Sequence, residues 1–108
     1  MRKYETPEID LACNPVWLKD AKTVLVTLIS TGGTWLKTFS TKDGTLKVSK
    51  DTGHMILRVT QEDTAQAPDN IIACGMVNVL TESGARFSSD PFKIPIMWNA
   101  FDEVIEDV

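Results

Sequence analysis

Met55-Ile-Leu-Arg-Val59 and Ile71-Ile-Ala-Cys-Gly-Met-Val-Asn-Val-Leu80 are two apolar runs joined by a short polar segment, and they decide the fold. The first run has an apolar side chain at every second position, which is the period of a strand with one buried face. The second run is apolar at nearly every position, as expected of a central strand that is covered on both faces. We therefore predict two core strands that form a central pair, with Leu57 and Val77 buried.

Further signals predict more short strands and a helical turn between the two core strands. Lys22 to Ile29 is dense in β-branched residues, and Thr31-Gly32-Gly33 supplies a tight hairpin before the chain returns. Thr60 and Asp63 have the spacing of a capping box, which predicts one helical turn after the first core strand. The other predicted strands span residues 4–11, 34–39, 45–48, 85–89 and 92–96.

Prolines mark the edges and turns of this pattern. Pro7 and Pro95 cannot donate a backbone hydrogen bond, so the strands that contain them are predicted at sheet edges. Asn14 followed by Pro15 favours another turn or a short helical turn, because asparagine caps such a turn and proline fits its first position. Roughly seven short strands with regularly spaced turns are typical of an antiparallel sandwich. We predict an all-β fold in which residues 1–108 form a single β-sandwich domain.

The composition is that of a folded globular protein, with 43% hydrophobic and 24% charged residues. No apolar run approaches the ~20 residues of a membrane span, so we expect no membrane partner. The formal net charge of −4 corresponds to four acidic residues within positions 102–107, which leaves 11 acidic and 11 basic side chains in the rest of the chain. The basic residues are scattered singly, whereas a phosphate-binding surface needs clustered Lys and Arg, so we expect no nucleic-acid partner.

The N-terminus and the cysteines favour a reducing compartment. Met1-Arg-Lys-Tyr-Glu-Thr-Pro7 is positively charged, but no apolar stretch follows it as in a secretory signal. Cys13 and Cys74 are too few for a disulfide framework and lack the spacing of a zinc or redox site. We predict two free thiols.

No catalytic, metal-binding or phosphate-binding constellation is visible in the sequence. His54 is the only histidine, and no orienting partner is indicated for it. Gly32-Gly33 lacks the Gly-Lys-Ser that completes a phosphate loop, and no serine lies in a Gly-x-Ser-x-Gly elbow. We predict a protein that is not an enzyme and needs no metal or cofactor.

Two sets of aromatic and apolar residues are candidate binding sites. Trp17 and Trp35 could form a ligand face for a carbohydrate or another small molecule, although a large aromatic residue often contributes to the core instead. In the acidic tail, residues 98–108, the apolar side chains recur at spacings of three and four, which predicts one face of a helix. This face either closes the end of its own sandwich or docks on a partner. The candidate partner contacts are Trp98, Phe101, Ile105, Val108, Asp102 and Glu103.

The order of strands and turns resembles a family of small prophage-encoded proteins found near tail and baseplate genes. The resemblance lies in Lys22-Thr-Val-Leu-Val-Thr-Leu-Ile29, in Met55-Ile-Leu-Arg-Val-Thr-Gln-Glu-Asp-Thr64, in residues 71–81 and 83–84, and in Phe92-Lys-Ile-Pro-Ile96. Its most telling feature is the strand that ends in Thr-Gln-Glu before a helical turn. The family is similar in plan to the immunoglobulin-like N-terminal domain of phage baseplate upper proteins, which implies an immunoglobulin-like sandwich.

The resemblance implies a non-enzymatic phage or prophage structural protein, a tail or baseplate component that acts through protein-protein contacts. Its expected partners are other phage structural proteins or further copies of itself. Such a chain would be made in the bacterial cytoplasm and reside in the virion if it is assembled there. The alternatives are a small carbohydrate- or ligand-binding module that uses exposed tryptophans and, more distantly, a phage-encoded inhibitor of a host protein.

Overall fold

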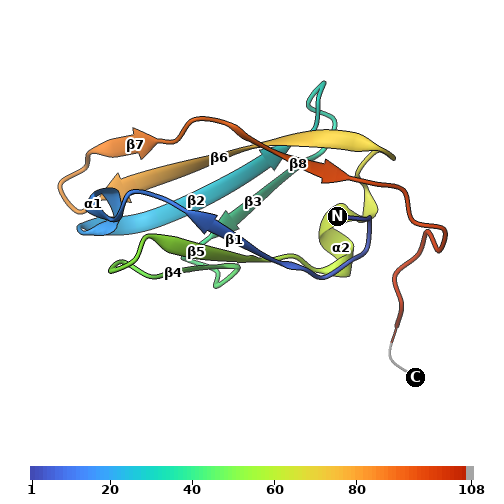
Figure 1. Cartoon of the computed structure of the whole chain (residues 1–108), viewed down its shortest axis with the longest axis horizontal. Helices are drawn as coiled ribbons and strands as arrows, with labels where there is room; N and C mark the ends of the chain where they lie inside the picture. Colours follow the sequence, from blue (N-terminus) through green and yellow to red (C-terminus); the bar gives the residue numbers. More distant parts are fainter. Residues whose placement is uncertain (107–108) are drawn as a thin grey trace.

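Two antiparallel β-sheets face each other in the computed structural model, which describes residues 1–106 (Figure 1). The small sheet contains, in spatial order, β1 (Glu8–Ala12), β5 (His54–Arg58) and β4 (Leu46–Val48). The large sheet contains, in spatial order, β3 (Leu36–Ser40), β2 (Ala21–Ile29), β6 (Ile71–Thr81) and β7 (Arg86–Ser88), and β8 (Phe92–Ile96) also pairs with β6. The predicted antiparallel β-sandwich is confirmed, and the described residues form eight strands.

Two short helices connect the strands, and both are capped by the residues that the sequence indicates. α1 (Pro15–Leu18) follows Asn14, whose side-chain oxygen accepts the backbone N–H of Val16 at 3.0 Å. α2 (Gln61–Ala65) begins after Thr60, whose backbone N–H donates to the Asp63 carboxylate at 2.8 Å. Neither of these helices is long enough to cross a membrane.

The two core strands lie in different sheets, so the prediction of a central pair is wrong. β5 is the middle strand of the small sheet, and β6 pairs with three strands of the large sheet. The reason is the connection between them, because the segment with α2 carries the chain from one sheet to the other. Leu57 and Val77 are nevertheless both buried, with exposed fractions of 0% and 4%, as predicted. Both belong to the core between the sheets.

β6 is covered on its inner face only, although its composition predicts two covered faces. Its side chains alternate between buried and accessible positions, and Ile72, Met76 and Leu80 are 54%, 37% and 40% exposed. In a two-layer sandwich, each sheet has just one face against the other sheet. Most outward residues of β6 are therefore apolar without being part of the core, and Asn78 is the polar exception.

Candidate protein interaction site

The C-terminal segment, residues 97–106, is not helical, so the predicted helix over residues 98–108 is wrong for its described part. Val108, the last residue of the predicted apolar face, lies outside the described residues. A helix of this length is marginal in water unless tertiary contacts stabilise it. Here the tertiary contacts stabilise an irregular backbone instead. The polar groups of the segment form hydrogen bonds to the N-terminal arm (residues 1–7), to Asn70 and to α2.

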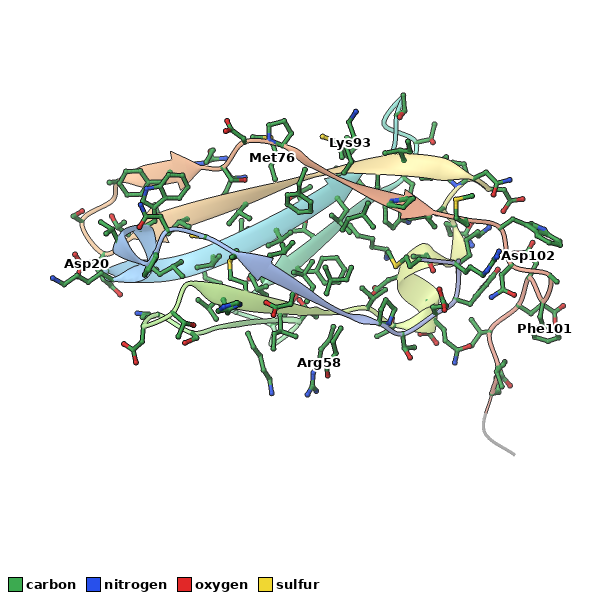
Figure 2. The ribbon with its side chains drawn as sticks, in the orientation of Figure 1. Asp20, Arg58, Met76, Lys93, Phe101 and Asp102 are labelled. Carbon is green, nitrogen blue, oxygen red and sulfur yellow. The ribbon has the colours of Figure 1, made fainter. Side chains whose placement is uncertain are left out.

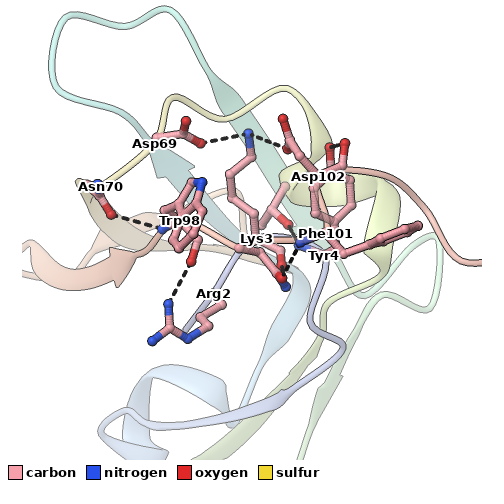
Figure 3. A network of polar contacts seen from close by, with 10 residues as sticks. Arg2, Lys3, Tyr4, Asp69, Asn70, Trp98, Phe101 and Asp102 are labelled. Atoms are coloured by element: carbon pink, nitrogen blue, oxygen red, sulfur yellow. Dashed lines mark hydrogen bonds and ion pairs between the residues drawn. The ribbon is translucent and has the colours of Figure 1, made fainter.

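Hydrogen bonds fix the beginning of the segment, several of them from residues drawn in Figure 3, and Met97 also makes backbone hydrogen bonds with Met1 and Lys3. The backbone N–H of Trp98 donates to the side chain of Asn70 at 2.9 Å, and the guanidinium of Arg2 donates to the Trp98 carbonyl at 2.7 Å. The side-chain amide of Asn99 donates to the Lys3 carbonyl at 2.9 Å. Both ends of the chain therefore lie together at one end of the sandwich.

The remainder of the segment is held by Tyr4 and by the first residue of α2. The hydroxyl of Tyr4 donates to the Asp102 carbonyl at 3.1 Å. Gln61 makes two hydrogen bonds to the backbone of Ile105: its amide nitrogen donates to the carbonyl at 3.1 Å, and its oxygen accepts the N–H at 2.7 Å. A pair of this kind fixes both the position and the direction of the backbone at Ile105.

A buried lysine connects the segment electrostatically to the loop before β6. Lys3 is 6% exposed, and its ammonium lies 3.2 Å from Asp69 and 3.5 Å from Asp102. Desolvation lowers the pKa of Lys3, but the hydrogen bond to Asp69 and the negative charges of Asp102 and Asp69 together outweigh it, so the pKa is raised above its ordinary value. Lys3 is therefore a charged group within the structure, held by two carboxylates.

The large apolar side chains of the anchored segment are exposed to solvent. Trp98, Phe101 and Ile105 are 51%, 54% and 70% exposed. A lid that closes the sandwich would bury these side chains. Asp102 and Glu103 are both exposed, and Asp102 also forms an ion pair with Lys3. The structure thus places the candidate partner contacts of this segment on a fixed backbone that presents Trp98, Phe101 and Ile105 to solvent.

The anchoring residues were missed by the sequence reasoning. Arg2 and Lys3 lie near the N-terminus, and the acidic residues lie at the opposite end of the chain. The opposite charges of the two chain ends are the one sequence feature that indicates a contact between them. The roles of Asn70 and Gln61 have no such signal, because each depends on a contact that only the folded chain creates.

The predicted ligand face of Trp17 and Trp35 does not form. Trp35 is 4% exposed, and its indole N–H donates to the Asp63 carbonyl at 3.0 Å, so it is a core residue that helps to hold α2. Trp17 is partly buried and stacks on Phe87, with ring centroids 5.8 Å apart and an angle of 15° between the rings. Trp17 also lines a pocket of about 370 Å³ together with Leu11, Cys13, Val77, Asp90, Phe92 and three further residues.

The one histidine has a partner that the sequence did not indicate. Nδ1 of His54 lies 3.1 Å from the Asp10 carboxylate on the neighbouring strand, and both side chains are more than half exposed. Cys13 follows β1 and lines the Trp17 pocket with Leu11, so strand alternation places it on the opposite side from Asp10. Burial raises the pKa of the Cys13 thiol, which disfavours the reactive thiolate. The pair of His54 and Asp10 is an exposed contact between β5 and β1, and Cys13 does not lie on its side of the strand.

Within residues 1–106, no three His, Cys, Asp or Glu side chains gather in a way that could hold a metal ion. Comparisons with models of protein families, with curated proteins and with solved structures found no match. The chain is an antiparallel β-sandwich whose C-terminal segment is anchored through its backbone and exposes apolar and acidic side chains.

Proposed function

We propose that this protein is a non-enzymatic structural component of a phage or prophage particle, from its tail or baseplate region, and that its C-terminal segment binds another protein. The observation that carries the proposal is the exposure of Trp98, Phe101 and Ile105 on a backbone fixed by Asn70 and Gln61. Large aromatic residues are frequent energetic centres of protein interfaces. A backbone that is already ordered loses less conformational entropy on binding.

The strand order supports the immunoglobulin-like part of the proposal. The order β1-β5-β4 has the neighbours of immunoglobulin strands B, E and D, and β3-β2-β6-β8 has those of strands C′, C, F and G. The isolated parallel bridge between Arg2 and Met97 adds a contact of the N-terminal arm beside the last strand. This arrangement agrees with the resemblance to the baseplate-region family, which implies a structural or attachment component of a phage particle.

Incorporation into particles tests the proposal. Tailed particles would be purified from a strain that carries the gene, and the amount of this chain would be measured by quantitative mass spectrometry. The test variant is the double substitution Trp98→Ala with Phe101→Ala, and the control is Val16→Ala, because Val16 is 75% exposed but belongs to α1. We expect the control to be incorporated like the unmodified chain and the double variant to be depleted at least tenfold.

Two results would contradict the proposal. Absence of the unmodified chain from the particles would show that it is not a particle component. Normal incorporation of a double variant that melts at the unmodified temperature would show that the C-terminal segment is not the contact.

A ligand-binding module is the second candidate, and the Trp17 pocket is the observation that favours it. Trp17 and Phe92 offer apolar area, and Asp90 and Ser89 offer polar groups at the same pocket, with Trp17 held by stacking on Phe87. Titration with simple sugars, followed by tryptophan fluorescence, tests this candidate. A saturable change that is lost in Trp17→Phe supports it, whereas unchanged fluorescence with every sugar rejects carbohydrate binding at this pocket.

A further inference from the structure

The outer face of the large sheet, the face turned away from the small sheet, carries exposed apolar side chains. The register places Ile29 opposite Cys74 and Thr27 opposite Met76, so outward residues of β2 and β6 lie side by side. Figure 2 shows Met76 and Lys93 on the side of the large sheet that faces away from β4 and β5. The exposed large apolar residues of this face are Ile29, Leu36, Ile72, Met76 and Leu80.

The charged residues of the outer face are all cations, although the chain as a whole has a net charge of −4. Lys93 pairs with Cys74, and Arg86 pairs with Leu80 at the other end of β6. No Asp or Glu occupies an outward position of these paired strands in the described chain. Arg86 donates to the side-chain oxygen of Asn78 at 3.0 Å, and no carboxylate among residues 1–106 lies within 4.0 Å of Arg86 or Lys93. The face is therefore apolar and positively charged.

A hollow of about 340 Å³ lies at one end of this face. Leu25 and Leu80 contribute apolar lining, and Lys42 and Arg86 contribute positive charge. Thr23 also lines the hollow, and its hydroxyl is the one buried side-chain oxygen or nitrogen of the described chain that has no hydrogen-bond partner. A hollow with this lining suits an aromatic side chain that has a carboxylate next to it.

The C-terminal segment has the complementary chemistry. Its exposed Trp98, Phe101 and Ile105 lie in the same ten residues as the acidic Asp102, Glu103 and Glu106. Its anchors hold it beside α2, and the chain leads away from β6 and β8 (Figure 1). In this conformation the segment does not lie on the outer face of its own large sheet. A contact between the segment and such a face therefore requires a second molecule.

We infer that the C-terminal segment of one copy docks on the outer face of the large sheet of a second copy. This inference rests on the proposed function, because it names the partner of the same segment. The two contacting surfaces are different, so each copy offers one segment and one face to its neighbours. A contact of this heterologous kind repeats from copy to copy and produces either a closed ring or an open filament.

The mass of the full chain in solution tests the inference, measured by sedimentation velocity from about 1 μM to about 500 μM. Two variants each remove one side of the contact: Met76→Asp alters the outer face, and Phe101→Asp alters the segment. Val16→Asp is the control, because it adds the same charge at an exposed apolar position of α1 that belongs to neither surface. Circular dichroism and melting temperature verify that every variant is folded.

We expect the unmodified chain and the control to associate with increasing concentration, and each variant alone to associate at least tenfold more weakly. An equimolar mixture of Met76→Asp and Phe101→Asp should form a dimer and no larger species. In that mixture the intact segment of Met76→Asp can dock on the intact face of Phe101→Asp. The resulting pair has no intact segment or face left, so it cannot bind a third molecule. Raising the salt from about 50 mM to about 500 mM should weaken association, because complementary charges contribute to it.

Three results would overturn the inference. If Phe101→Asp alone still dimerises while Met76→Asp does not, the contact is face to face. If the mixture of variants stays monomeric, the contact is not head to tail. If the unmodified chain is monomeric at every concentration, self-association is excluded. Incorporation of the chain into particles is measured separately, so this failure is distinguishable from failure of the proposed function.

Discussion

Leu57 lies in β5, and its side chain is fully buried between the two sheets. Replacing it with alanine removes buried methyl groups and leaves a cavity that the neighbouring side chains fill only in part. We predict that Leu57→Ala lowers the free energy of unfolding by about 2–5 kcal/mol. Urea denaturation measures this loss, with Leu36→Ala as the control, because Leu36 is 54% exposed. A loss under about 0.5 kcal/mol would place the core elsewhere.

Two glycines with the same backbone conformation allow steric overlap to be separated from backbone strain. Gly44 and Gly53 both have a φ of +79°, but a Cβ at Gly44 would meet no atom within 4 Å, whereas a Cβ at Gly53 would overlap the carbonyl oxygen of Cys13. The backbone N–H of Cys13 also donates to the Gly53 carbonyl at 2.9 Å, so the two segments cannot separate without losing this hydrogen bond. We predict a loss of about 1–2 kcal/mol for Gly44→Ala from the left-handed conformation alone.

For Gly53→Ala we predict a loss beyond about 3 kcal/mol, the upper end of ordinary substitutions. Chemical denaturation of both variants under one set of conditions gives the comparison. Equal losses in the two variants would mean that the loop around Gly53 can move away from Cys13 at little cost.

The stability of the protein should fall at alkaline pH because of Lys3. The pKa of Lys3 is raised in the folded chain, so its contribution is complete below the unfolded value of about 10.4 and is lost as the pH rises through the folded pKa. The pKa of Tyr4 is also raised, by desolvation first and then by Asp102, so it acts in the same direction. We predict that the melting temperature declines above about pH 10 and that this decline is shallower in Lys3→Met. Lys19→Met, at an exposed position, should follow the unmodified chain.

At the scale of secondary structure, the sequence predicts what local chemistry controls. β-Branched residues and alternation identify β2, β5 and β6, and the caps at Asn14 and Asp63 are local contacts over two and three residues. The edge position of β8 follows from Pro95, which has no N–H to donate to a further strand. Each of these features is decided within a few residues of chain.

The features that the sequence did not predict depend on contacts between distant segments. A spacing of three and four residues favours a helix in residues 98–108, but it cannot include the hydrogen bonds that Arg2 and Asn70 make to Trp98. In the same way, the apolar composition of β6 does not reveal whether a second layer covers its outer face. Trp35 is predicted as a candidate for binding because composition alone does not distinguish a core indole from an exposed one.

Removing residues 99–108 should leave the sandwich folded. Among the described residues, the buried core ends along the chain at Ile96 and includes none of residues 99–106. The truncated chain loses Asp102 as a partner of Lys3 and Ile105 as a partner of Gln61, so we predict a melting temperature lower by a few degrees. Thermal melting, followed by circular dichroism, measures the change. Asp102→Asn serves as the partial control, and an unfolded truncated chain would mean that the segment is a lid.

At the scale of the whole molecule, the distribution of charge and the anchoring of the chain ends have a common consequence. The N-terminal arm provides Arg2, Lys3 and Tyr4, which fix a segment that carries exposed apolar and acidic groups. The outer face of the large sheet, which is turned away from the small sheet, is exposed, apolar and positively charged. A globular domain rarely exposes large contiguous apolar patches without an interaction partner. Two such surfaces of opposite charge on one chain are the basis for the head-to-tail contact.

The whole fold should be independent of disulfide bonds. Cys13 and Cys74 are free thiols, one after β1 and the other on the outward side of β6. A chain of this length buries roughly two thirds of its unfolded surface, which is enough for stability without covalent cross-links. We predict that a reducing agent leaves the melting temperature unchanged and that two thiols react with a thiol reagent after denaturation without reductant. The double variant Cys13→Ser with Cys74→Ser is the control, and it should show no response to reductant. If reduction lowers the melting temperature of the unmodified chain by several degrees, the two cysteines are bonded in solution, contrary to the structure.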